Sequence, residues 1–145
     1  MSRLGGWLHG GLALLLLAGP LAGCSARIDV PENVIVGPRP AQMRPGPELD
    51  FAAPPAIAQI WLSSLVLQRG TNWDGQIATS TNAASIEVRT DSFSFSVPRV
   101  RSGIFAFSYA IPDLPPYLRR HFALHVVARN AAGDKFDESL PIEIR

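Results

Sequence analysis

The sequence predicts an all-β domain over residues 56–145, folded as an antiparallel β-sandwich of about seven strands. Short segments in this region alternate apolar and polar residues with the period of two that is typical of half-buried strands. Turn-forming residues separate these segments, and no stretch shows a helical period over three turns. Two packed sheets would bury the aromatic and branched faces while the outward residues remain in water.

The first three strands are predicted between residues 60 and 89. The first run carries Ile60, Leu62 and Val66 and ends at Arg69-Gly70. A turn over residues 72–75 precedes the second run, which covers residues 76–81. In the third run, Ile86 and Val88 point to one side and Glu87 and Arg89 to the other, as strand geometry requires.

The later strands show the same alternation more regularly. Serines separate the apolar residues of the fourth, and Pro98 closes it. The predicted inward positions are Phe93, Phe95 and Val97; Phe105, Phe107 and Tyr109; Leu124, Val126 and Ala128; and Leu140, Ile142 and Ile144.

Residues 24–55 are predicted to be a proline-rich tether. Proline removes amide donors and favours extended backbone, so this segment should be semi-rigid and partly polyproline-II-like. Its length would reach ~90 Å fully extended, or ~30 Å as a flexible coil. Residues 34–36 are predicted to form a short strand, a partner-docking motif or simply extended chain. The prolines are Pro31, Pro38, Pro40, Pro45, Pro47, Pro54 and Pro55.

Residues 1–23 have the pattern of a secretory signal peptide. Arg3 supplies a positive charge, and an apolar run over residues 12–18 ends at Gly19-Pro20. This run is well short of the ~20 residues that span a bilayer, so a signal helix that is cleaved off is favoured over a transmembrane helix.

The segment Leu21-Ala22-Gly23-Cys24 follows directly and resembles the lipobox of bacterial lipoproteins. The resemblance implies that signal peptidase recognises Leu21, Ala22 and Gly23, and that Cys24 receives covalent lipid and becomes the new amino terminus. In a Gram-negative cell, Ser25 after the cysteine favours the outer membrane, facing the periplasm. The alternative is an ordinary signal peptide with an incidental cysteine nearby.

Charge and cysteine content exclude several classes of function. The chain has 13 basic and 12 acidic residues, and loss of Arg3 with the leader leaves 12 of each. A neutral chain argues against nucleic-acid partners and against a polybasic membrane patch, so membrane attachment must come from lipid. The one cysteine allows no internal disulfide, and no cofactor other than the lipid is expected.

Residues 121–134, which read His-Phe-Ala-Leu-His-Val-Val-Ala-Arg-Asn-Ala-Ala-Gly-Asp, resemble the penultimate strand and turn of bacterial immunoglobulin-like domains. In those domains an apolar alternation runs into a turn of this composition, and the final strand pairs after it. The resemblance implies an immunoglobulin-like sandwich, although the cysteine pair of antibody domains is absent.

No catalytic or metal site emerges from the sequence. His121 and His125 lie four residues apart in a predicted strand, ~13 Å from each other, which is too far to share a metal. Asp134, Asp137 and Glu138 surround a turn; a solvated acidic hairpin is favoured there over a calcium site.

The loop over residues 111–120 is the most unusual segment of the domain. Paired prolines stiffen it, and Tyr117 and Leu118 are candidates for partner contact, with Arg119 and Arg120 as a polar rim. The alternative is a loop that packs Leu114 and Leu118 over the open end of the sandwich.

These features predict a non-enzymatic cell-envelope lipoprotein, anchored to the membrane through lipid, whose domain makes protein–protein or structural contacts. The alternative is a glycan-binding or enzyme-accessory module, which needs an exposed platform from Trp61, Trp73 or Tyr117. A hydrolase is a weaker third hypothesis, because it requires His121 or His125 to meet an acid and a serine in one pocket.

Overall fold

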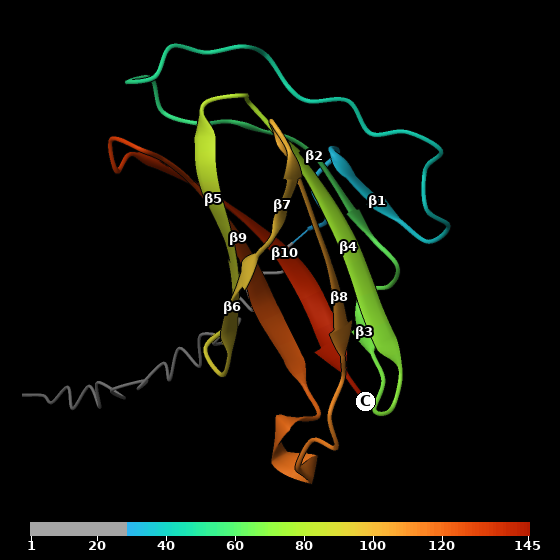
Figure 1. The fold of residues 1–145 in the computed structure, drawn as a ribbon. Coiled ribbons are helices and arrows are strands. Elements are labelled where there is room, and N and C mark those ends of the chain that lie inside the picture. Colours follow the sequence, from blue (N-terminus) through green and yellow to red (C-terminus); the bar gives the residue numbers. More distant parts are fainter. Residues whose placement is uncertain (1–28) are drawn as a thin grey trace, which may run out of the picture.

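The computed structural model describes residues 29–145, which form two β-sheets packed face to face (Figure 1). Sheet A has the strand order β1-β2-β4-β8-β7, and sheet B has the order β3-β10-β9-β5-β6. The strands of sheet A are β1 (Val34–Val36), β2 (Ile57–Leu62), β4 (Asn72–Thr79), β8 (Ile104–Ala110) and β7 (Arg99–Arg101). Those of sheet B are β3 (Val66–Leu67), β10 (Lys135–Ile144), β9 (His121–Asn130), β5 (Ala83–Arg89) and β6 (Ser94–Val97).

The predicted all-β sandwich is confirmed, but its strand count and pairing differ from the prediction. There are ten strands rather than about seven, and both sheets are mixed. β1 pairs parallel with β2, and β3 pairs parallel with β10, while the other pairs are antiparallel. The extra strands are only two or three residues long, too short to show an alternating pattern in the sequence.

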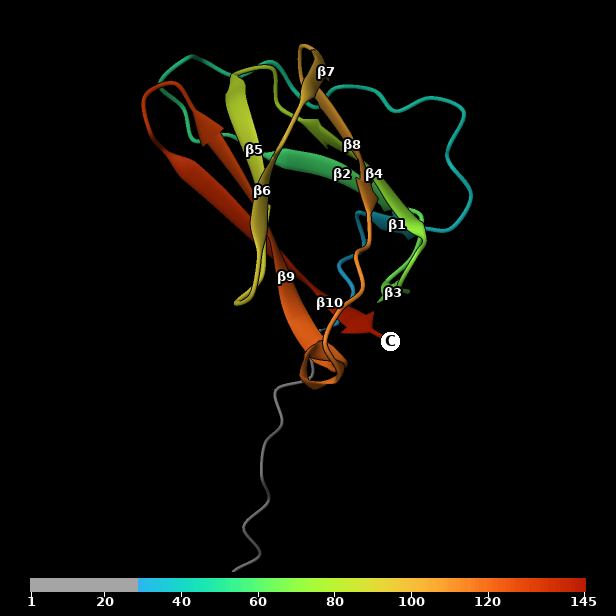
Figure 2. The same cartoon turned by 60° about the horizontal axis from the view of Figure 1, so that its bottom comes forward.

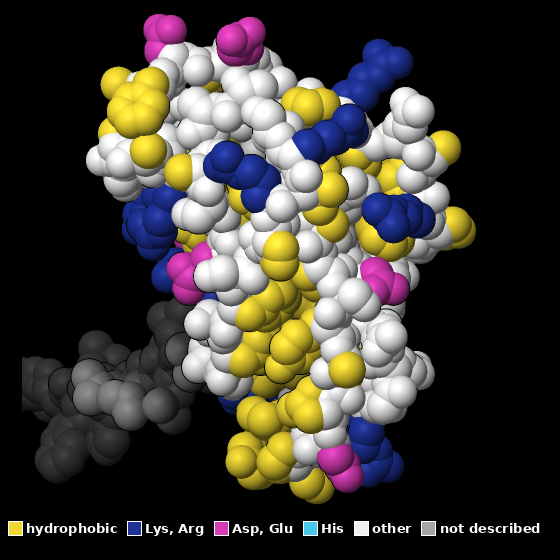
Figure 3. Space-filling model, in the orientation of Figure 1, with side chains coloured by type: hydrophobic (Ala, Val, Ile, Leu, Met, Phe, Trp, Pro, Cys, Tyr) yellow, Lys and Arg dark blue, Asp and Glu magenta, His cyan; other side chains and the backbone are white. Residues whose placement is uncertain are grey.

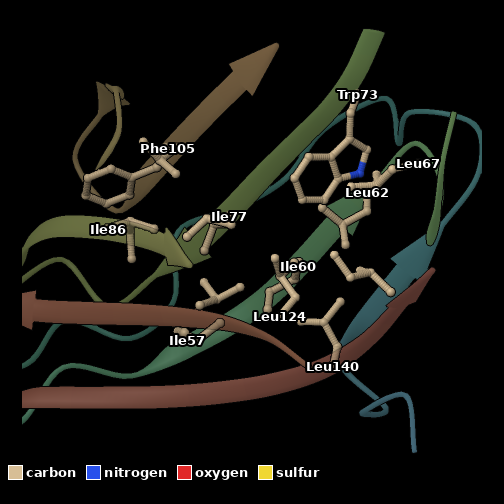
Figure 4. Close-up of a cluster of buried hydrophobic side chains, with 14 of the residues drawn as sticks. Ile57, Ile60, Leu62, Leu67, Trp73, Ile77, Ile86, Phe105, Leu124 and Leu140 are labelled. Atoms are coloured by element: carbon tan, nitrogen blue, oxygen red, sulfur yellow. The ribbon is translucent and has the colours of Figure 1, made fainter. Parts of the chain in front are cut away.

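The core lies between the two sheets and is formed by the predicted alternating positions. Ile60 and Ile77 from sheet A face Leu124 and Leu140 from sheet B, and all four are fully buried (Figure 4). Burying each such side chain contributes about 1.5–3 kcal/mol to folding, so this interior dominates the stability of the domain.

The turn predicted over residues 72–75 is wrong, because these residues begin β4. Trp73 is buried in the core, and its indole Nε1 donates to the carbonyl of Ser64 at 3.0 Å. A side chain at Gly75 would meet the ring of Phe107, so the glycine allows a close approach within a strand rather than a turn. Asparagine, aspartate and glycine together resembled a turn, but burial of the tryptophan outweighs this local preference.

Residues 33–47, which fall within the predicted tether, lie against the sandwich. Ile60 N donates to Asn33 O at 3.0 Å, and the Asn33 amide donates to Glu138 Oε2 at 3.0 Å. Further along, Gly46 N donates to Thr79 O at 2.9 Å. Part of this segment therefore belongs to the folded domain, and Figures 1 and 2 show the chain between β1 and β2 passing around the edge and one end of the sandwich.

This segment covers part of the outer face of sheet A. Met43 is buried and packs with Trp61, Ala78 and Ile104, with Ile35 beside them. The indole Nε1 of Trp61 donates to Gly37 O at 3.0 Å. The part of this segment after β1 thus forms a partial third layer, and a sheet face that would otherwise meet water becomes a second small core. We call residues 33–47 the N-terminal cover.

Gly103 is expected to be the least replaceable glycine under the N-terminal cover. Its φ is +68°, and an added Cβ would lie 2.8 Å from Thr79 O and 2.9 Å from Pro45 Cβ. Gly103→Ala should therefore add a clash to backbone strain and lower the free energy of unfolding by about 2–4 kcal/mol in urea denaturation. Gly70→Ala is the matched control: its φ is +74° with nothing within 4 Å, so only about 1–2 kcal/mol should be lost. Equal losses at the two positions would contradict the packing of Pro45 on Gly103.

Within residues 29–145 there is no α-helix; the one helical element is a short 3-10 turn, η1 (Pro116–Leu118). No helix in this part of the chain is long and apolar enough to cross a membrane. The predicted signal peptide, the lipobox and Cys24 lie outside the described residues, so their assignment stays a prediction.

Candidate functional site

The loop between β8 and β9 closes one end of the sandwich, opposite the β4–β5 turn (Figures 1 and 2). Leu118 N donates to Pro115 O at 3.0 Å, and Arg119 N donates to Pro116 O at 3.1 Å, which closes the single turn of η1. Proline fixes φ near −65°, so the two prolines set the loop's shape before any partner is bound.

This loop both covers the core and presents a side chain to solvent. Leu114 and Leu118 are partly buried and pack against the main core, whereas Tyr117 is 76% exposed. The predicted packing of the two leucines over the open end is therefore confirmed. Of the candidate contact residues, Tyr117, Arg119 and Arg120 are exposed, and Leu118 is held beneath them. A rigid loop with an exposed aromatic residue is the type of feature that serves as an anchor in protein interfaces.

Two ion pairs tie the loop to neighbouring elements. Arg69 Nη1 lies 2.9 Å from Asp113 Oδ1, and the hydrogen bond to Asp113 raises the pKa of Arg69 above its ordinary value. Arg120 Nη2 lies 3.2 Å from Asp91 Oδ2, and its guanidinium sits 4.7 Å from the ring centroid of Phe122. Exposed pairs contribute little stability, so the loop is held mainly by the packing of Leu114 and Leu118 on the core.

An aromatic strip adjoins the loop, at the open edge of the sandwich between β6 and β8. Phe95 lies 5.1 Å from Phe107 and 5.2 Å from Tyr109, measured between ring centroids, and Phe93 stacks on Phe95 at 6.5 Å. Figure 3 shows hydrophobic side chains running down the centre of this face to the lower end of the molecule. A small apolar cavity of about 100 Å³ lies between the strip and the loop, lined by residues that include Phe93, Tyr109, Leu114 and Leu118.

Sequence reasoning placed these aromatic residues correctly on inward faces but did not recognise that the two rows meet. Phe93 and Phe95 come from the edge of sheet B, and Phe107 and Tyr109 from sheet A. A signal was present, since Pro98 interrupts the chain between the two aromatic alternations, where it passes from one sheet to the other.

The two tryptophans within residues 29–145 do not form a platform for sugar rings. Trp61 is 5% exposed and Trp73 is 2% exposed. Trp61 lies beneath the N-terminal cover, and Trp73 lies in the main core. Of the three aromatic residues considered for stacking, only Tyr117 keeps an exposed ring.

His125 meets a serine and an acid on the outward face of sheet B. Its Nδ1 lies 3.0 Å from Ser139 Oγ and 3.0 Å from Asp137 Oδ1, and Asp137 also contacts Arg89 at 3.4 Å. In a serine hydrolase, the serine and the acid bind opposite nitrogens of the histidine ring. One nitrogen accepts the proton of the serine, and the N–H of the other nitrogen donates a hydrogen bond to the acid. Here both partners share Nδ1, so this cluster does not have the geometry of a catalytic relay.

The acidic residues near the β9–β10 turn point to separate partners. Asn130 Nδ2 donates to Asp134 Oδ2 at 3.1 Å and to Ala53 O at 2.8 Å. Asp137 binds His125, and Glu138 accepts a hydrogen bond from Asn33. Within residues 29–145 no group of three or more His, Cys, Asp or Glu side chains is placed to hold a metal ion. The turn instead ties residues 51–53 to the hairpin.

Fold and site together define the described part of the chain as a β-sandwich domain without recognised catalytic geometry. No protein-family model matches the sequence, and no curated protein matches it. The structure is similar to part of a DUF4785 family protein from Legionella pneumophila, with a TM-score of 0.48, 11% identity and coverage of 59% of this chain and 27% of that one. It is also similar to a mutant of the SrpA adhesin from Streptococcus sanguinis, with a TM-score of 0.40, 17% identity and coverage of 63% and 57%. The chain thus spans about a quarter of the Legionella protein and just over half of the adhesin chain.

Proposed function

We propose that this chain is a lipid-anchored protein of the bacterial cell envelope whose β-sandwich acts as a non-catalytic contact module for another protein. The observation that carries the contact role is the exposed Tyr117 on a stiff loop whose leucines are partly buried against the core. A side chain held in this way loses little conformational entropy on binding, so more of its contact energy appears as affinity.

The anchor is supported by the sequence Leu21-Ala22-Gly23-Cys24 directly after an apolar run. Diacylglyceryl transfer to the Cys24 thiol, with acylation of the new amino group, supplies two or three chains, enough for stable attachment. Outer-membrane placement facing the periplasm, favoured by Ser25, is part of this proposal.

We also infer that the sandwich is of the immunoglobulin-like type, and its support is the order of the strands. The order β2-β4-β8-β7 corresponds to strands A-B-E-D of such domains, and β10-β9-β5 to G-F-C. The short β3 continues β2 and joins the other sheet, beside β10. The chain departs from antibody domains in its added β1 and in placing the core Trp73 on the second strand of this order.

A glycan-binding module is the second candidate, favoured by the exposure of Tyr117 alone. It predicts that purified protein binds immobilised envelope polysaccharide and that Tyr117→Ala abolishes the binding. The burial of both tryptophans weighs against it, because sugar sites depend on broad exposed aromatic faces.

Photo-crosslinking in the native cell tests the proposed function. A benzophenone amino acid at position 117 should capture a defined envelope protein, identified by mass spectrometry, in the membrane fraction. The matched control places the same group at Phe136, which is exposed on β10, and should not capture that protein.

The same experiment in a Cys24→Ser background tests the anchor. The variant lacks the lipid-accepting thiol, so it should appear in the soluble fraction or remain unprocessed, with unchanged thermal unfolding. Equal capture from positions 117 and 136 would argue against the contact loop, and a Cys24→Ser protein that stays processed and membrane-bound would argue against lipidation.

A further inference from the structure

The outer face of sheet A carries two adjoining depressions beside the N-terminal cover. One, of about 530 Å³, is lined by residues 39–43 together with Gln76 and Arg101. The other, of about 570 Å³, includes Trp61, Ser63, Asp74 and Ser108. Arg39 borders both, and we call the first of them, lined by residues 39–43, Gln76 and Arg101, the hollow.

Gln76 supplies a buried amide at the floor of this hollow. It lies in one row with Trp61 on β2 and Ala106 on β8, and it is only 8% exposed. Its side-chain amide forms no hydrogen bond with the rest of residues 29–145. Every fully enclosed side-chain nitrogen or oxygen in these residues does have a partner, so the Gln76 amide is not fully enclosed. The amide therefore opens into the hollow, where it is available to a ligand.

The arginines around the hollow have no acidic partner. The arginine ion pairs within residues 29–145 are formed by Arg69, Arg89, Arg120 and Arg145. Arg101 donates one Nη2 hydrogen bond to Met43 O at 2.8 Å, which leaves other guanidinium donors unused. Arg39 lies 5.8 Å from the ring centroid of Trp61.

We propose that this hollow binds a carboxylate from an extended acidic segment of a partner protein, with Arg39, Arg101 and Gln76 as the donors. A guanidinium matches a carboxylate with two parallel N–H···O bonds, and such charge-assisted bonds are the stronger ones in proteins. The proposal goes beyond the contact loop, because it concerns a different surface and a defined ligand chemistry.

The neighbouring edge of sheet A favours a peptide over a sugar as the source of the carboxylate. β7 is the last strand of the sheet, and all three of its residues are exposed. Its outer backbone groups can therefore pair with an added extended segment. A carboxylated sugar would need an open aromatic face, and Trp61 is covered.

Fluorescence anisotropy with the purified full-length protein tests the proposal. The probe is a labelled decapeptide of alternating glutamate and serine at low ionic strength, where exposed charges are least screened. The wild-type protein should bind it, and Arg39→Gln with Arg101→Gln should weaken binding at least about tenfold. Arg129→Gln, on β9 of the other sheet, should change it less than about twofold.

Folding and ligand class are checked separately. Arg39 forms no side-chain hydrogen bond within residues 29–145, so Arg39→Gln alone should weaken binding without lowering the melting temperature. The same peptide with glutamine for glutamate should not bind. Equal binding by the double variant, or tighter binding of a polyuronate or of phosphatidylglycerol vesicles than of the peptide, would overturn the proposal. Because the probe does not involve Tyr117, this result is independent of the crosslinking at the contact loop.

Discussion

Trp73→Ala is expected to lower the free energy of unfolding by about 3–5 kcal/mol, the usual cost of removing a large buried aromatic side chain. Trp73 is 2% exposed, packs edge-on against Phe107 at 5.0 Å between centroids, and donates its indole hydrogen bond to Ser64 O. This bond holds the segment where the chain leaves β2 for β3. Urea denaturation followed by circular dichroism measures the loss.

Two further variants separate the contributions of Trp73. Trp73→Phe keeps much of the packing and loses the bond to Ser64, so about 1–2 kcal/mol should be lost. Tyr117→Ala, at an exposed position, should change stability by less than about 0.5 kcal/mol. If Trp73→Ala were as mild as Tyr117→Ala, residues 72–75 would not be part of the core and a surface turn would describe them better.

Met43→Ala is expected to lower the free energy of unfolding by about 2–4 kcal/mol, because Met43 is only 2% exposed beneath the N-terminal cover. It packs on Trp61 and Ile104, and its carbonyl accepts the bond from Arg101. Loosening the cover should also speed its cleavage by subtilisin, with the cut sites located by mass spectrometry.

The exposed neighbour Arg44 supplies the matched control. Arg44→Gln changes an exposed side chain in the same segment, so its unfolding free energy should stay within about 0.5 kcal/mol of wild type. A free tether predicts no stability change for either variant. Such a result would contradict the packing of residues 33–47 on sheet A.

The parts of the fold that sequence reasoning predicted are those in which one face meets the core. The residues Leu124, Val126 and Ala128 are fully buried in β9, and the polar residues His125 and Arg129 next to them are partly exposed. Burial on one side of a strand leaves a period of two in the sequence, and no partner needs to be known to recognise it.

The N-terminal cover was not predicted, because its contacts are not periodic. Single residues such as Ile35 and Met43 reach the sheet between prolines, and the backbone bonds of Gly46 and Pro47 go to Thr79 and Thr81. High proline content shows that a segment lacks regular structure, and this was taken to mean that it lacks contacts.

Of the two candidate sites, one was predicted from the sequence and the other was not. The loop over residues 111–120 was predicted because its proline pairs are local in the sequence. The hollow on sheet A was not, since Arg39, Gln76 and Arg101 come from three distant segments that only the folded chain brings together.

The attachment of Asn33 and β1 to the sheet sets how far the domain can travel from a membrane. If Cys24 carries the lipid, only nine residues separate it from Asn33, the first residue bound to sheet A, so the fully stretched connection spans about 30 Å. If residues 24–55 were a free tether, the domain could reach roughly three times as far from its anchor. The volume open to it would then be about thirty times as large. With that anchor, the short connection would keep the domain next to the bilayer, where it would meet mainly partners that are themselves held at that surface, at a correspondingly higher effective concentration.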